Sequence, residues 1–195
     1  MELTLDFSKR YTYADYLTWL DDVRRELIEG FIKLLPAPRI SHAMVSCNIS
    51  WHLVSILKEK KGKCMVLYAP VDVRLPKNGE TANDKIYTVV QPDICIVCDL
   101  SKLDEYGCMG APDMIVEILS PSTAKKDMTE KFVLYEESGV KEYWIVYPGE
   151  KAVNVFLLQD NNKYDDGKIY ERKAKIPVNV FNNHLIDLDD IFEGI

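Results

Sequence analysis

The sequence predicts a single-domain protein that combines helices with a β-sheet, an α/β or α+β fold, and three observations support this prediction. A chain of 195 residues with 47% hydrophobic and 28% charged residues can bury one substantial core, so residues 1–195 are expected to form one domain. Apolar residues recur at helical spacing in three segments. Between and after these segments, short β-branched runs alternate with clusters of Gly, Pro and Asn, which is typical of strands joined by turns.

The first two elements follow from local signals near the N-terminus. Residues 12–23 carry Tyr and Leu at helical spacing, and Thr12 with Asp15 forms a capping box, so a short amphipathic helix is expected there. Residues 25–35 form a strand or a tight hairpin that turns at Gly30 and ends at the Pro-Ala-Pro sequence that follows.

Two longer helices are predicted by their apolar stripes and by their end signals. The first covers residues 42–60, with Ser41 as its cap and Gly62 as its stop. The second begins at Asp127, which forms a D-x-x-E cap, and ends at Gly139. The apolar stripe of the first of these helices consists of Val45, Ile49, Leu53, Ile56 and Leu57.

The strands of the expected sheet are the β-branched runs with a period of two. Before the last helix they cover residues 65–68, 71–75, 89–98 and 114–119. After it, residues 142–147 and 152–158 form a hairpin through Pro148-Gly149-Glu150, and an apolar tail covers residues 185–192.

The cysteines and the lack of long apolar runs indicate a soluble, cytoplasmic protein. The five cysteines are odd in number and lie mostly in apolar runs, so we expect reduced, buried thiols and no disulfide. Cys95 and Cys98 are three apart on a strand and should point to opposite faces, which argues against zinc. No run approaches the length of a membrane span, and the N-terminus lacks the pattern of a secretory signal, so no membrane contact is expected.

The net charge of −7 argues against a protein that coats nucleic acid nonspecifically, because Lys and Arg supply most nonspecific affinity for phosphates. It does not exclude a nuclease, because a metal site made of carboxylates is itself acidic. Two basic clusters could hold a nucleic-acid backbone or could be solvated ends of secondary-structure elements. They are Lys58-Lys60-Lys61-Lys63 and Arg172-Lys173-Lys175.

Two acidic residues stand out because they lie in apolar strands. Asp93 and Glu117 would be costly there unless a cation, hydrogen bonds or solvent meets them. If their strands are neighbours, the two carboxylates can converge on a hard cation such as Mg²⁺, which prefers oxygen ligands. Lys131 lies one turn into the helix that follows and can reach back toward the ends of the strands.

Each of these residues also has a plainer interpretation. Asp93 and Glu117 could be a capping residue and a solvent-facing residue at strand ends. Lys131 could be a surface lysine paired with Asp127, which would contribute little to stability. His42, at the start of a helix, is expected to form a hydrogen bond near the site or to cap the helix rather than to bind a metal.

Several runs resemble the Uma-two family of restriction-endonuclease-like proteins, within the PD-(D/E)XK nuclease superfamily, over nearly the whole chain. They are Arg25-Glu26-Leu27-Ile28-Glu29-Gly30, His42 after a Pro-x-Pro loop, Pro92-Asp93, Val116-Glu117-Ile118-Leu119-Ser120-Pro121-Ser122-Thr123, Asp127-x-x-x-Lys131-x-x-x-Tyr135 and Gly139-Val140-x-Glu142-Tyr143-Trp144-x-Val146. The resemblance implies a restriction-endonuclease-like core, a mixed β-sheet flanked by helices, with a metal-dependent phosphodiesterase site.

The resemblance also implies roles for individual residues. Asp93 and Glu117 would hold Mg²⁺ or Mn²⁺ together with the backbone carbonyl of Ile118. Glu26 would be the upstream glutamate, although Glu29 lies three residues on and either could face the site. Leu119 occupies the position where the superfamily has its lysine, and the resemblance suggests that Lys131 on the next helix supplies the ammonium instead.

The function that these expectations favour is hydrolysis of DNA phosphodiester bonds by a metal-dependent endonuclease. The alternative is a non-catalytic module that keeps the fold and binds nucleic acid or protein. The displaced lysine and the negative net charge agree with this alternative. A homodimer is expected from the resemblance, because such enzymes commonly cut two strands.

Overall fold

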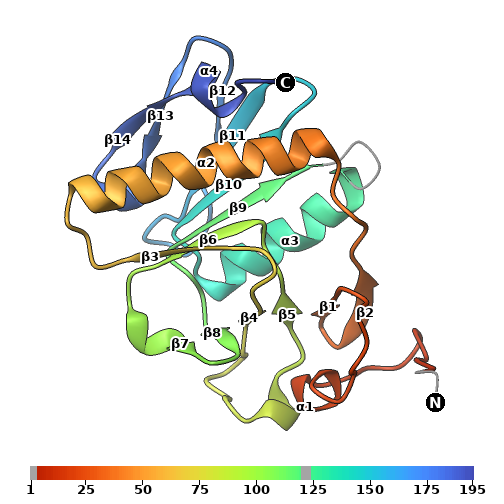
Figure 1. Cartoon of the computed structure of the whole chain (residues 1–195). Helices are drawn as coiled ribbons and strands as arrows, with labels where there is room; N and C mark the ends of the chain where they lie inside the picture. Colours follow the sequence, from red (N-terminus) through yellow and green to blue (C-terminus); the bar gives the residue numbers. More distant parts are fainter. Residues whose placement is uncertain (1–3, 120–123) are drawn as a thin grey trace.

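The fold is built around a six-stranded mixed sheet (Figure 1). The computed structural model describes residues 4–119 and 124–195, with the exception of the side chains of residues 124–128. The strand order in this central sheet is β12-β11-β10-β9-β6-β3, in which β9 and β10 are parallel and the other neighbours are antiparallel. Its strands are β3 (Met65–Tyr68), β6 (Ile94–Val97), β9 (Met114–Ile118), β10 (Glu142–Tyr147), β11 (Ala152–Leu157) and β12 (Lys168–Tyr170).

The two faces of the central sheet are covered by different helices. Side chains alternate between faces along each strand, so Ile94 and Ile96 join one apolar cluster while Cys95 and Val97 join another. The first cluster includes the buried stripe of helix α2 (Ile40–Glu59), and the second includes residues of helix α3 (Ala124–Ser138). The predicted fold class, a mixed sheet flanked by helices in one domain, is confirmed.

A second six-stranded sheet contains the N-terminal hairpin and lies below the central sheet in Figure 1. Its order is β2-β1-β5-β4-β8-β7. Its strands are β1 (Arg25–Ile28), β2 (Phe31–Leu34), β4 (Val73–Arg74), β5 (Val89–Val90), β7 (Leu103–Asp104) and β8 (Gly107–Met109). Helix α1 (Tyr13–Tyr16) and the short 3-10 helices η1 (Asn83–Lys85) and η2 (Leu100–Lys102) belong to the same part of the chain.

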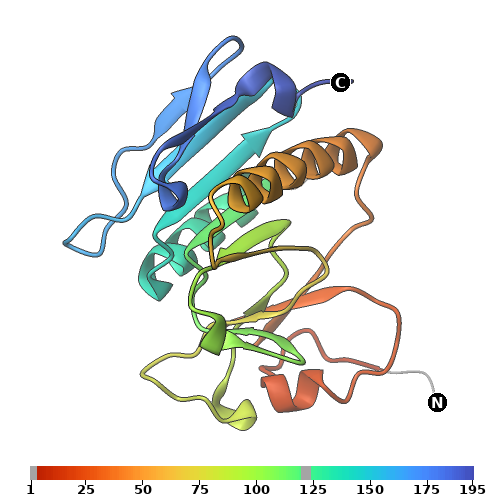
Figure 2. The same cartoon turned by 60° about the vertical axis from the view of Figure 1, so that its left-hand side comes forward.

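The C-terminal residues form a two-stranded ribbon against the α2 side of the central sheet, as Figure 2 shows. The ribbon consists of β13 (Lys175–Val178) and β14 (His184–Asp187), joined through the 3-10 helix η3 (Asn179–Phe181). Helix α4 (Leu188–Ile191) follows and packs against α2.

Local signals predicted several elements closely. The hairpin of β1 and β2 turns at Glu29 and Gly30, both with positive φ. Gly139, with φ of 86°, follows α3, and β10 pairs with β11 across the predicted Pro-Gly turn. Glycine is required at position 30 of the β1–β2 turn, because an added Cβ would lie within 3.2 Å of Arg10, Tyr11 and Tyr87.

The N-terminal helix is shorter than predicted. The capping box of Thr12 and Asp15 is present, but α1 ends at Tyr16. The Thr18 hydroxyl donates to the Asp15 carbonyl at 2.6 Å, a local bond that competes with continuation of the helix. Beyond it, Leu20 is 94% exposed, so the apolar spacing that suggested a longer helix has no core to face.

The predicted caps of both longer helices differ from the structure. Helix α2 begins at Ile40 with Arg39 at its N-cap and no side-chain cap, so Ser41 lies inside the helix. Helix α3 begins at Ala124, three residues before the expected cap at Asp127, whose side chain lies outside the described part of the chain.

The run 89–98 was expected to be one strand and is instead divided between the two sheets. Strand β5 belongs to the second sheet and β6 to the central sheet. Pro92 lies between them, and because proline has no N–H to donate, it interrupts the ladder at this point. The chain therefore crosses from one sheet to the other directly before Asp93.

The prediction that no disulfide forms is wrong. Cys64 precedes β3 and Cys98 follows β6, and because Met65 faces Val97 in the antiparallel register, the two cysteines also face each other and are disulfide-bonded. Cys47, Cys95 and Cys108 are free, and Cys47 is exposed rather than buried. Cys95 and Cys98 do point into different apolar clusters, as expected.

Helix α2 has the length and apolar composition of a membrane span, and within the described residues no other helix does. This is weak support for a membrane contact, because core helices of soluble proteins share these properties. Val45, Ile49 and Leu53 of α2 are fully buried in the main apolar cluster.

Candidate active site

Asp93 and Glu117 lie opposite each other on neighbouring strands of the central sheet. The register pairs Ile94 with Val116 and Cys95 with Ile115, which places Asp93 beside Glu117 at the end of this ladder. Alternation along both strands puts their side chains on the α3 face of the sheet. Asp93 also accepts a hydrogen bond of 2.7 Å from the backbone N–H of Ile118. The predicted neighbouring strands and shared face are confirmed.

Lys131 bridges two carboxylates at this position. Its Nζ lies 2.8 Å from Oε1 of Glu117 and 2.9 Å from Oε1 of Glu26. The side chain of Lys131 is 12% exposed, and that of Glu26 is 2% exposed. Helix α3 brings the lysine over the end of β9, and the hairpin of the second sheet brings Glu26 from below, so the site joins both sheets.

The choice between Glu26 and Glu29 is settled by the hairpin. Glu26 is on β1 and faces inward, where Oε1 also accepts a hydrogen bond of 2.8 Å from the backbone N–H of Gln91. Glu29 lies at the hairpin turn with φ of 53° and forms an exposed ion pair with Lys77. Only Glu26 reaches the carboxylate cluster.

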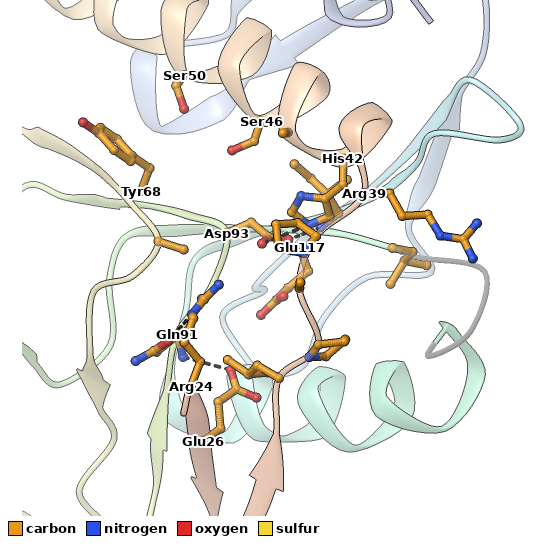
Figure 3. A pocket seen from close by; sticks show the side chains of 18 of the residues that line it. Arg24, Glu26, Arg39, His42, Ser46, Ser50, Tyr68, Gln91, Asp93 and Glu117 are labelled. Carbon is orange, nitrogen blue, oxygen red and sulfur yellow. Dashed lines mark hydrogen bonds and ion pairs between the residues drawn. The ribbon is translucent and has the colours of Figure 1, made fainter. Parts of the chain in front are cut away.

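Tyr135 and His42 complete the shell of donors around the two acids. The Tyr135 hydroxyl donates to Oε1 of Glu117 at 2.6 Å, one turn of α3 after Lys131. His42, in the first turn of α2, has its Nε2 3.1 Å from Oδ1 of Asp93 (Figure 3). The expected hydrogen bond of His42 near the site is confirmed.

Burial and clustering strongly perturb the ionisable groups. Burial, opposed by Lys131 and assisted by the charges of Asp93 and Glu26, raises the pKa of Glu117 to about 7. Although burial alone would lower it, the pKa of Lys131 is raised well above its usual range by Glu117 and Glu26. Perturbed groups that meet in a cleft are typical of functional sites.

The pKa of His42 is also raised. Burial opposes this shift, but the hydrogen bond and charge of Asp93 and the charge of Glu117 outweigh it. The imidazole is therefore held in a more basic state next to the acidic cluster than it would be in water.

The carboxylates lie at the floor of a large groove of about 1010 Å³, which is called the α2 groove below. One wall is the face of α2 that carries Ser46 and Ser50, as Figure 3 shows, and the other includes Tyr68. Arg24 also lines the groove, with its Nε 3.1 Å from Oε1 of Gln91.

The ligand chemistry of this floor suits a hard divalent cation. Glu26, Asp93 and Glu117 bring three carboxyl groups together, whereas Lys131 and His42 are the basic groups in contact with them, so acidic groups outnumber basic ones. Ile118 donates its N–H toward Asp93, and since the C=O of a strand residue points to the same side as its N–H, the Ile118 carbonyl points there too. Within the described residues, no group of three or more His, Cys, Asp or Glu side chains is already arranged around one metal position.

Three residues of the site were not anticipated from the sequence. Tyr135 belongs to a run that resembles the family but was given no role; it is fully buried, and its hydroxyl donates to Glu117. Gln91 and Arg24 carry no signal of their own, although Gln91 lies two residues before Asp93 in the segment that crosses between sheets. Of the basic clusters, Lys58 lines the groove, whereas Arg172 lies 3.9 Å from Asp189.

Comparison with known proteins identifies the class. The family model Uma2, described as "Putative restriction endonuclease", matches residues 13–188, and the chain belongs to this family. A solved structure from Anabaena variabilis, described as a putative nuclease belonging to DUF820, has a TM-score of 0.73 at 20% identity and covers 93% of this chain and 97% of its own, so it shares the fold. A protein of Synechocystis described as uncharacterized is 25% identical over 156 residues, 78% of this chain and 74% of its own length.

Proposed function

We propose that this protein is a metal-dependent endonuclease that hydrolyses DNA phosphodiester bonds, with Mg²⁺ or Mn²⁺ held by Asp93, Glu117 and the carbonyl of Ile118. Membership of a family of restriction-endonuclease-like proteins supports a nuclease. The observation that carries the proposal is the gathering of three carboxyl groups at the groove floor, where burial and the neighbouring acids raise the pKa of Glu117 to about 7. A bound cation would relieve this repulsion.

The metal, when bound, would lower the pKa of a water molecule and neutralise charge that develops on the phosphate. The roles of the protein's own groups follow from their contacts. Tyr135 and Lys131 both donate to Oε1 of Glu117 and fix the orientation of that carboxylate. Lys131 also presents a permanent positive charge beside the acids, where it can orient the attacking water and offset charge on the reacting phosphate.

Glu26 and His42 position other members of the site. Glu26 holds Lys131 together with Glu117, which keeps the ammonium close to the floor of the groove. His42 bonds Asp93 at one carboxylate oxygen while the Ile118 N–H bonds it at the other. Asp93 is therefore fixed before any ligand arrives, which is the condition for efficient electrostatic catalysis.

The test is cleavage of plasmid DNA, linear duplex DNA and single-stranded DNA during titration with Mg²⁺ or Mn²⁺, with Glu117→Gln as the inactivating change. The amide keeps the shape but removes the charge, so cleavage should fall by at least roughly 10²- to 10³-fold. Glu142→Gln is the matched control, because Glu142 is also a buried glutamate of the central sheet but lies outside the groove.

Two outcomes would contradict the proposal. A parent protein that binds DNA without cleaving it at any metal concentration would favour the non-catalytic binding module. Cleavage that persists unchanged in Glu117→Gln would assign the activity to another site or to a contaminant.

A further inference from the structure

The walls of the α2 groove differ in charge from its floor. Among the residues that the structure describes, the carboxylates that line the groove lie at its floor, in Glu26, Asp93 and Glu117. The other charged residues that line it are basic, which is unexpected in a chain of net charge −7. They are Arg24, Lys33, Arg39, Lys58 and, at the floor, Lys131.

Three of these cations have no acidic partner among the described residues. Lys33 is paired with Glu130 at 2.8 Å. In the part of the chain that the structure describes, no carboxylate lies within ion-pair distance of Arg24, Arg39 or Lys58. Unpaired cations along the walls of a groove suit a polyanion that runs through it.

Exposed aromatic side chains line the same groove. Trp51 on α2 is 65% exposed and Tyr68 at the end of β3 is 67% exposed, and both line it. Leu34, 55% exposed, lines it too. Exposed apolar residues that gather along one groove indicate a binding surface.

We infer that the α2 groove binds a single-stranded polynucleotide, with phosphates held by the basic side chains and unpaired bases stacked on Trp51 and Tyr68. This inference rests on the proposed function, because it names the form in which the nucleic acid reaches the active site. Aromatic platforms beside a basic track are how proteins hold single strands. A duplex keeps its bases stacked inside and offers these rings no free base face.

The serines of α2 agree with the same ligand. Ser46 and Ser50 project from α2 into the space that Tyr68 flanks on the other side (Figure 3). Short hydroxyl side chains leave room for a backbone and can donate to phosphate oxygens. The groove leads from this segment to Asp93 and Glu117, so a strand that follows it would pass its phosphates over the carboxylate floor.

The binding test uses the full chain carrying Glu117→Gln in Mg²⁺, so that cleavage does not consume the probe. The probes are a labelled DNA oligonucleotide of mixed sequence, its duplex, and the RNA of the same sequence. The single strands should bind more tightly than the duplex. Tighter binding of either the single-stranded DNA or the RNA supports the inference, and the ratio of their affinities shows which of the two nucleic acids the groove prefers.

The residues are tested in the same background with matched controls. Trp51→Ala should weaken binding of the single strand roughly 5- to 150-fold, as loss of one stacked base predicts. Lys58→Gln should reduce the slope of log affinity against log salt by about 0.7. Tyr106→Ala and Lys85→Gln, which change an exposed aromatic and an exposed cation outside the groove, should leave both quantities unchanged.

Fluorescence distinguishes stacking from a structural role of Trp51. Trp51 is the one strongly exposed tryptophan of three, since Trp144 is fully buried and Trp19 is partly buried. Trp51→Phe should keep the affinity but lose the quenching of emission that binding causes. Trp51→Ala should lose both while keeping the melting temperature.

Other occupants of the groove would overturn the inference. A duplex that binds as tightly as the single strand, or a Trp51→Ala variant with unchanged affinity, would do so. So would a parent dimer that Trp51→Ala converts to monomers, because a second copy would then cover the groove. A blue shift of Trp51 emission on neutral phosphatidylcholine vesicles would assign this face to a membrane. All of these results leave the cleavage test of Glu117→Gln intact.

Discussion

Two buried glutamates of the central sheet, Glu117 and Glu142, show what separates a candidate catalytic carboxylate from a structural one. Both lie on neighbouring parallel strands, and burial raises the pKa of both. Glu142 is 1% exposed, and the donors of its hydrogen bonds within the described residues are all neutral. These are the Trp144 indole, the Asn179 side chain and backbone, and the Val180 backbone.

Glu117 has different neighbours. It accepts from a lysine and a tyrosine, lies beside two further acids and opens onto a groove. Glu142 instead ties β10 to the turn of the C-terminal ribbon. Burial alone therefore does not mark a functional carboxylate. A candidate functional carboxylate is recognised by neighbouring like charges, a charged hydrogen-bond donor and access to a cavity.

The largest effect should come from removing the charged donor. Lys131→Ala should reduce cleavage by roughly 10²- to 10⁴-fold, because the group that handles the proton or stabilises charge is lost. It also leaves Glu26 and Glu117 without their shared cation, which should destabilise the metal-free protein by roughly 3–5 kcal/mol. Cleavage assays and urea unfolding, each with and without Mg²⁺, measure both effects.

Two further variants sharpen this test. Lys131→Arg should not restore the rate, because a planar guanidinium cannot occupy the same point. Lys141→Ala is the control, since Lys141 is paired with Asp113 but its side chain is 70% exposed, and the change should affect stability by no more than about 1 kcal/mol. An alanine variant at 131 that cleaves like the parent would favour the binding module.

Tyr135→Phe should have the next largest effect, because it removes only the neutral donor to Glu117. The side chain is fully buried and the change keeps its shape, so the fold should persist. A hydrogen bond to a charged group contributes roughly 1.5–3 kcal/mol, and loss of this one should lower kcat about 10-fold or more with little change in KM. An equal change in KM would instead point to a role in substrate binding.

Glu142→Gln should reverse the pattern seen at Glu117 by lowering stability and sparing cleavage. An amide nitrogen would face one of the donors that the carboxylate now accepts, which should cost roughly 1–3 kcal/mol of unfolding free energy. Chemical unfolding and cleavage of the same preparation measure both properties. A variant that loses cleavage at unchanged stability would break the comparison.

The same variant should also change the dependence of stability on pH. Because burial raises the pKa of Glu142 above 4.5 in the folded protein, its contribution is fully present below pH 4.5 and is lost as the pH rises through the folded pKa. Glu142→Gln lacks this component. Its deficit relative to the parent should therefore shrink as the pH rises above 4.5, and a constant deficit would argue against the raised pKa.

Local signals determine what could be predicted of the fold. The hairpin at Gly30, the end of α3 at Gly139 and the buried stripe of α2 each depend on residues close together in the chain. The disulfide of Cys64 and Cys98 and the division of 89–98 between two sheets depend on strand register, which pairs distant segments. Pairing between distant segments produces no local sequence pattern from which it could be predicted.

The candidate site also combines features set by local sequence with features set by contacts between distant segments. Period two assigned Asp93 to the face of Cys95 and Glu117 to the face of Ile115, and the register of β6 and β9 makes these the same face. The contact of Lys131 with Glu26 spans 105 residues, and the hydrogen bond from Tyr135 to Glu117 depends on how α3 lies over β9. For Tyr135, spacing shows only that it follows Lys131 by one turn, not that its hydroxyl meets an acid.

Glu29→Gln should have the smallest effect, and it tests the point that the sequence left open, which of two glutamates serves the site. Glu29 is 58% exposed in its pair with Lys77, and such exposed pairs contribute about 0–1 kcal/mol. Glutamine keeps the same side-chain length and meets the same positive φ of 53°, so no new backbone strain arises. Glu26→Gln, which removes a buried charge from Lys131, should lower cleavage about 10- to 100-fold, as loss of a residue that orients a ligand does. Cleavage rates of the two variants, measured in parallel, should therefore differ by at least about 10-fold. Equal rates would mean that Glu26 holds Lys131 without contributing to the reaction.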